Sequence, residues 1–121
     1  MEALGSYPSE RGALKDMVRI TDNQKFELGQ LVATKSVSDL RERDPGFNEF
    51  AVRSLFRYAV GDWGDSPEDD KAENDLSVKL ESEGKQASRI VAVYNAEGLP
   101  TIWIITEWDR SYTTVLFPDE Y

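Results

Sequence analysis

An acidic stretch, residues 61–75, holds the densest group of side chains that could do chemistry in this chain. Seven carboxylates lie there against one lysine. Hard divalent cations such as Mg²⁺ and Ca²⁺ are bound by several carboxylate oxygens, so a cluster of Asp62, Asp65, Asp69 and Asp70 could hold one. The spacing does not match the calcium loop of an EF-hand. The same carboxylates would also stabilise the start of a helix with a solvated face, which is the commoner arrangement.

The chain contains neither cysteine nor histidine. These absences remove thiolate chemistry, disulfides, the commonest general base and the commonest zinc ligand. No nucleophile elbow, phosphate-binding loop or dinucleotide-binding glycine pattern is present either. We therefore expect no catalytic residue, no cofactor and no bound metal. The alternative is a small divalent-metal-dependent hydrolase or nuclease that uses Asp62, Asp65 and Asp70 together with Glu107.

Trp63 stands between two glycines inside this acidic stretch. Its ring could anchor an interface, because tryptophan is enriched at binding hot spots that a polar rim surrounds. Burial is the commoner fate of a loop tryptophan, and we favour it while leaving both possibilities open. In the helix expected to follow, Asp70 and Asn74 are i, i+4 neighbours, as are Asp69 and Glu73, so the face next to Trp63 would be strongly acidic.

A second charged group lies in a turn near the C-terminus, at Glu107, Asp109 and Arg110. Arg110 could clamp an anion next to the two carboxylates. An ion pair between Glu107 and either Arg89 or Arg110 across neighbouring strands is the commoner arrangement.

The net charge of −9 limits the possible partners. It argues against direct binding of nucleic acid or of an anionic membrane, because both are polyanions, and it favours a protein partner with a basic surface. No apolar run approaches the ~20 residues of a membrane span, and the first residues do not resemble a signal peptide. Together with the absence of cysteine, this predicts a cytoplasmic protein.

Two helices are expected to position the acidic side chains. Residues 47–60 carry a broad apolar stripe at helical spacing, with Asn48 as the N-cap. Residues 66–80 begin with Ser66 as the N-cap and Pro67 at the first helical position. The apolar side chains of this second helix form a narrow stripe that we expect to face inward: Ala72, Leu76 and Leu80.

The remaining pattern predicts strands. Residues 26–34 resemble a strand, and a short helix is expected at 36–43. Residues 88–94, 101–108 and 112–117 are rich in β-branched and aromatic side chains, and short loops join them, which predicts an antiparallel meander. The expected fold class is α+β, with a four-stranded, mostly antiparallel sheet, a C-terminal β-meander and two to three helices packed on one face.

A chain of 121 residues is long enough for one domain with a real core. We expect residues 1–25 to form a flexible N-terminal extension and residues 26–121 to form a single α+β domain. Residues 102–105 are apolar on both alternations, so the central strand is either covered on both faces or presents one face as an interface.

Several blocks in order, over about residues 28–121, resemble a family of short uncharacterised bacterial proteins that are carried on plasmids, phages and other mobile elements. The resemblance implies no known reaction. Members of the family tend to carry a histidine near the position of Tyr58, which this chain lacks. The matching blocks are Leu28-Gly29-Gln30-Leu31-Val32-Ala33-Thr34, Gly61-Asp62-Trp63-Gly64-Asp65, Thr101-Ile102-Trp103-Ile104-Ile105-Thr106-Glu107, Asp109-Arg110 and Thr113-Thr114-Val115-Leu116-Phe117-Pro118-Asp119-Glu120-Tyr121. The single positions Asp70, Asn74, Arg89 and Tyr94 match as well.

These observations together favour a non-enzymatic protein-interaction module with an acidic surface. The resemblance implies a mobile-element factor that inhibits a host defence or nucleic-acid-handling complex. The predicted binding residues are Asp62, Trp63, Asp65, Asp69, Asp70, Asn74, Glu107 and Arg110.

Overall fold

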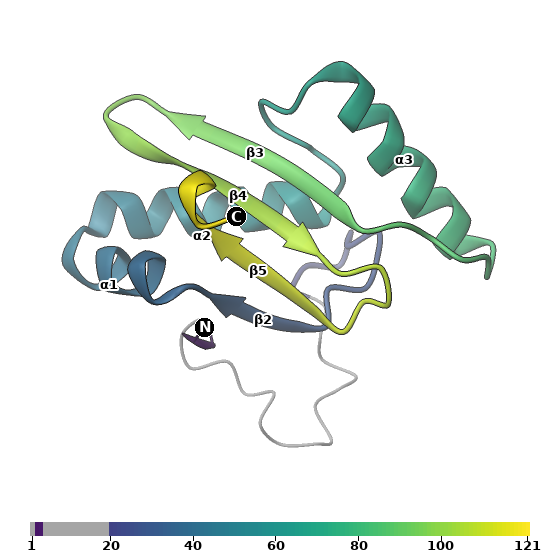
Figure 1. Cartoon of the computed structure of the whole chain (residues 1–121), viewed down its shortest axis with the longest axis horizontal. Coiled ribbons are helices and arrows are strands. Elements are labelled where there is room, and N and C mark those ends of the chain that lie inside the picture. The colour runs from purple at the N-terminus through teal and green to yellow at the C-terminus, as the bar shows by residue number, and fades with distance from the viewer. Residues whose placement is uncertain (1, 4–19) are drawn as a thin grey trace.

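A mixed β-sheet forms the centre of the computed structural model, which describes residues 2–3 and 20–121 (Figure 1). The strand order is β1-β2-β5-β4-β3. Four strands have four to eight residues each, and a two-residue strand pairs with the first of them at the edge of the sheet. The strands are β1 (Glu2–Ala3), β2 (Gln30–Ala33), β3 (Ile90–Ala96), β4 (Leu99–Thr106) and β5 (Tyr112–Leu116).

The α+β fold class and the mostly antiparallel sheet are confirmed. β3, β4 and β5 form the predicted meander, in which Ile104 lies opposite Ala92 on one side and Val115 on the other. β2 is the parallel member, and its Leu31 lies opposite Thr113 of β5. A parallel pair needs a long crossover connection. All three α-helices and the other two strands of the meander provide it here.

The helix α2 (Pro45–Ala59) passes behind the sheet in the view of Figure 1, and α1 (Lys35–Arg43) lies next to α2 at the left of the sheet. The Thr34 side chain caps α1 by accepting a hydrogen bond from the Val37 N–H. Asp44 caps α2, and Pro45 occupies its first turn. The sequence interpretation of Asn48 as the cap was wrong, because the Asp-Pro pair that was expected to stop one helix starts the next one.

The main core lies between this helical layer and the sheet. Phe47, Leu55 and Tyr58 of α2 are buried there against apolar side chains of the three meander strands. The Tyr58 hydroxyl also contacts the Thr106 hydroxyl at 2.8 Å and donates to the Ile90 carbonyl. Burial raises the pKa of this phenol, so it stays neutral and its hydrogen bonds join α2 to β3 and β4.

The opposite face of the sheet is also largely buried. Val32, Ile105 and Leu116 are 5–8% exposed, although none of them belongs to the main core. Trp103 on the same face is half-buried and contacts the ring of Tyr121. The low exposure of Ile105 agrees with the expectation that the central strand is covered on both faces.

The third helix, α3 (Glu68–Ser82), packs against the edge strand β3 and not on the face that α1 and α2 cover (Figure 1). Its buried side chains are Asn74 and Ser77. The expected inward stripe of Ala72, Leu76 and Leu80 was therefore wrong: Ala72 is exposed, Leu76 is 54% exposed and Leu80 is half-buried. The reason is that a strand edge offers backbone polar groups, which need polar partners.

Packed structure begins before Phe26. The buried Gln24 accepts a hydrogen bond from the Ile20 N–H and donates to the Phe26 carbonyl, and the Lys25 N–H donates to the Ala59 carbonyl. Glu2 and Ala3 pair with β2. The rest of the expected N-terminal extension, residues 1 and 4–19, lies outside the described residues. Within the described part of the chain, no helix combines the length and apolar character that crossing a membrane requires.

Candidate functional site

Trp63 lies in the core. It is 4% exposed, and its ring packs against those of Phe26 and Tyr58 at centroid distances of 5.8 and 5.5 Å. The indole N–H donates to the Asp75 carboxylate at 2.8 Å, so the polar atom of the buried ring is satisfied. Of the two fates that the sequence left open for this ring, the structure shows burial.

Asp62 is held by Arg57, the last basic side chain of α2. The guanidinium Nε donates to Asp62 Oδ2 at 2.8 Å, and the Gly64 N–H donates to Asp62 Oδ1. The hydrogen bond from Arg57 lowers the pKa of the Asp62 carboxyl below its usual range. This carboxylate therefore shapes the turn between α2 and α3, although half of its side chain remains exposed.

The structure explains why residue 64, in the Gly61–Asp65 block, is a glycine. Its φ is +62°, and a Cβ atom there would lie 2.5 Å from the Tyr94 ring and 2.6 Å from the Val93 carbonyl oxygen. The chain makes an isolated parallel bridge with Val93 at this point. Only glycine allows so close an approach of this turn to β3.

The outer edge of β3 is covered by side chains from this turn and from α3. The Val93 N–H donates to Ser66 Oγ at 3.0 Å, and the Asn95 N–H donates to Asp65 Oδ2 at 2.8 Å. Asn74 Nδ2 donates to the Val91 carbonyl at 2.9 Å. Asp65 and Asn74, two predicted binding residues, thus replace the neighbouring strand that this edge lacks.

Arg110 connects the turn between β4 and β5 to α3. Its side chain is 9% exposed, and Nε contacts Glu81 Oε1 at 2.7 Å. The same guanidinium donates to the carbonyl of Ser88 and to that of Glu107. The ion pair of Arg110 is therefore with Glu81 and not with Glu107, whose carboxylate forms no salt bridge with the described residues.

The acidic residues in the part of the chain that the structure describes do not assemble a metal centre. Within residues 2–3 and 20–121, no three acidic side chains come together in a group that could hold a metal ion. Asp62 and Asp65 are engaged by Arg57 and by the Asn95 N–H. Among the described residues, Asp62, Asp65 and Asp70 are therefore not brought together as a set of metal ligands.

Two of the predicted residues, Asp69 and Asp70, remain on the surface of α3. With Glu73 they form a row of exposed carboxylates that make no salt bridge among the described residues. The apolar stripe of this helix lies beside them, with Ala72 and Leu76 exposed and Leu80 half-buried. We refer to this surface as the α3 outer face, which consists of Asp69, Ala72, Glu73, Leu76 and Leu80.

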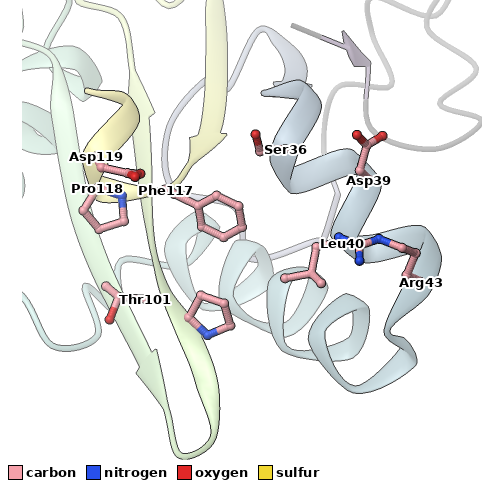
Figure 2. A pocket seen from close by; sticks show the side chains of 9 residues that line it. Ser36, Asp39, Leu40, Arg43, Thr101, Phe117, Pro118 and Asp119 are labelled. Carbon is pink, nitrogen blue, oxygen red and sulfur yellow. The ribbon is translucent and has the colours of Figure 1, made fainter.

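A separate open pocket of about 660 Å³ lies between α1, β4 and the short helix η3 (Pro118–Glu120). Figure 2 shows the Phe117 ring pointing into it, toward Leu40. Arg43 and Asp119 line the pocket and form no salt bridge with the described residues. Asp39, which pairs with Lys35, also lines the pocket, so the lining contains two carboxylates and one guanidinium.

Sequence reasoning found the acidic surface but missed the polar inner face of α3. A signal was present, because Asn74, Ser77 and Glu81 recur at helical spacing. Each of them makes a hydrogen bond to a part of the chain outside α3: Asn74 to β3, Ser77 to the loop before β3, and Glu81 to the turn between β4 and β5. A polar stripe on a helix that must pack somewhere indicates a polar surface beneath it.

Comparisons with protein-family models, with curated proteins and with solved structures found no match to this chain. The site must therefore be interpreted from its own geometry.

Proposed function

We propose that this protein is an acidic, non-enzymatic interaction module that binds a basic protein surface through the α3 outer face. The observation that carries the proposal is Leu76. It is 54% exposed in the middle of a helix whose neighbouring carboxylates, Asp69 and Glu73, have no cationic partner in the described part of the chain. An apolar side chain with a charged rim is the usual composition of a small binding surface.

The difference between the two faces of α3 supports this proposal. The inner face is satisfied by β3, since Asn74 and Ser77 bond to backbone groups near that strand. The outer face carries the apolar stripe of the helix, and Ala72 and Leu76 of that stripe remain exposed. Burying Leu76 against a partner would contribute about 1–2 kcal/mol, and the carboxylates would speed the encounter with a basic surface.

The net charge of −9 indicates what kind of partner fits. A polyanion would be repelled from the α3 outer face, whereas a protein surface rich in arginine and lysine would be attracted. The sequence resemblance to proteins of mobile elements supplies the biological expectation, namely that the partner belongs to a host defence or nucleic-acid-handling complex. Proteins of that kind commonly carry basic surfaces because they bind nucleic acid.

The experiment compares charge reversal on the α3 outer face with the same change elsewhere. The test variant is Asp69→Lys/Glu73→Lys, and the matched control is Glu42→Lys/Glu97→Lys, in which both positions are also exposed. Proteins from the native host that the parent retains are quantified for each variant, and a purified partner is then titrated at two salt concentrations. The proposal predicts weakening by ~1–3 kcal/mol with the test variant only.

Leu76→Asp separates contact from charge attraction. It removes the apolar centre of the face while the helix and its inner contacts stay the same, so binding should also weaken at high salt. Equal effects of the test and control variants would mean that the partner responds only to overall charge, and the proposal would fail.

A further inference from the structure

A pocket of about 400 Å³ lies where α3 meets the sheet. One wall comes from α3, with Asp70 and Glu73, and the other from the sheet face opposite α1 and α2, with Trp103. Tyr121 and Arg89 complete the lining. The pocket is therefore acidic on one side and aromatic on the other.

The aromatic wall of the pocket already contacts a cationic side chain of this protein. The Trp103 and Tyr121 rings lie 5.2 Å apart at an interplanar angle of 58°. The guanidinium carbon of Arg89 lies 5.2 Å from the centre of the Tyr121 ring, and Arg89 also donates a hydrogen bond to the Tyr121 hydroxyl. An arginine of this chain thus rests on the aromatic wall, as cation–π attraction favours.

The acidic side has no such partner. Asp70 and Glu73 are exposed, and neither forms a salt bridge with the described residues. Arg89 is engaged by Tyr121, so the pocket has two carboxylates and one cation. Its electrostatic balance favours a further positive charge.

We propose that this pocket receives an arginine side chain from the basic partner. A guanidinium is planar, so it can stack on an aromatic ring while its N–H groups reach carboxylates on the other side, which a lysine ammonium does less well. This inference rests on the proposed function, because it names the group through which the partner would be anchored beside the α3 outer face.

The test uses a small probe, so it does not require the partner. N-acetyl-arginine amide is titrated into the full chain while backbone amide and tryptophan indole signals are followed by NMR, and the neutral isostere N-acetyl-citrulline amide is titrated in parallel. The arginine probe should shift the Trp103 indole signal and the amide signals of Asp70 to Asn74. The citrulline probe should bind at least about tenfold more weakly because it lacks the charge.

Two variants with the same change in charge locate the effect. Asp70→Asn/Glu73→Gln removes the carboxylates of the pocket and should weaken the arginine probe at least about fivefold. Glu42→Gln/Glu97→Gln removes two exposed carboxylates outside the pocket and outside the α3 outer face, and it should change the affinity less than about twofold. Trp103→Leu keeps an apolar side chain but removes the ring, so it should also weaken the arginine probe.

Equal shifts with the citrulline probe, or equal weakening by the two double variants, would overturn the pocket proposal. That outcome leaves the proposed function standing if Asp69→Lys/Glu73→Lys still releases the partner. In the converse case the probe binds as expected while the α3 outer face variants retain the partner. The pocket would then bind arginine, but the proposed function would fail.

Discussion

Replacing Asn74 by aspartate should destabilise the protein more than replacing it by alanine. The Asn74 amide is 4% exposed, and its Nδ2 donates to the Val91 carbonyl at 2.9 Å. The second contact, from the Val91 N–H to Oδ1, is 3.5 Å long and weak. Asn74→Ala therefore loses one good hydrogen bond and leaves a carbonyl without its partner, which costs roughly 2 kcal/mol.

Aspartate has nearly the same shape, but an ionised carboxylate cannot donate. Its oxygen would face the Val91 carbonyl oxygen in a buried position, so we expect a loss of roughly 3 kcal/mol at pH 7. The pKa of the new carboxyl should be raised in the folded state, because the protonated form can donate to Val91. The extra loss should therefore be absent below the ordinary pKa of about 4 and should grow as the pH rises through the raised value.

The assay is urea-induced unfolding at pH 7 and near pH 4, with Asn23→Asp as the matched control. Asn23 is exposed in a turn, so the same change of charge there should alter the free energy of unfolding by less than about 0.5 kcal/mol. Hydrogen exchange of the β3 amides should also accelerate in the Asn74 variants. If Asn74→Asp is no worse than Asn23→Asp, or if its deficit is independent of pH, Asn74 does not protect this edge as described.

Two further predictions concern the turn between α2 and α3. Gly64→Ala should destabilise the fold by roughly 3 kcal/mol or more, because its Cβ would lie 2.5 Å from the Tyr94 ring. The control is Gly84→Ala, which is also at positive φ but has no atom within 4 Å of the added Cβ. It should cost roughly 1 kcal/mol in the same denaturation assay. Asp62→Asn should cost less than about 1 kcal/mol at pH 7, since the contact with Arg57 is half-exposed and screened by solvent. The folded-state pKa of Asp62 is lowered, so the contribution of this ion pair to stability is present above the ordinary carboxyl pKa and is lost as the pH falls through the lowered value. The melting temperatures of parent and variant should therefore converge in acid. A difference in melting temperature that persists there would contradict the ion-pair explanation.

The elements whose periodicity depends on an apolar core were the easiest to predict. The meander strands and α2 followed from β-branched runs and from a broad stripe at helical spacing. The boundary at Asp44-Pro45 failed, because the same two residues can end one helix or begin another. The parallel pairing of β2 with β5 was not specified by any local pattern, since a short apolar strand carries no information about the direction of its neighbour.

The candidate site was harder to predict for a physical reason. Composition identified an acidic region, but it could not tell which carboxylates were already in use. Asp65 bonds to the Asn95 N–H and Asp75 to the Trp63 indole, whereas Glu73 makes no salt bridge with the described residues. These three side chains have similar chemistry in the sequence. Only the path of the turn and the position of α3 along β3 separate them.

The placement of α3 links the protection of the sheet to the proposed binding surface. An edge strand with free N–H and C=O groups invites pairing with another chain. Here Asn74 and Ser66 occupy those groups on β3, so a partner cannot bind by adding a strand at that edge without displacing them. The helix makes this contact with polar side chains such as Asn74, and its Val78 packs against the core. Leu76 lies on the other side of the helix and is exposed. The exposure of Leu76 is thus a consequence of how α3 covers the edge of β3. Because the edge is covered, a partner of α3 can use the α3 outer face but not the sheet edge.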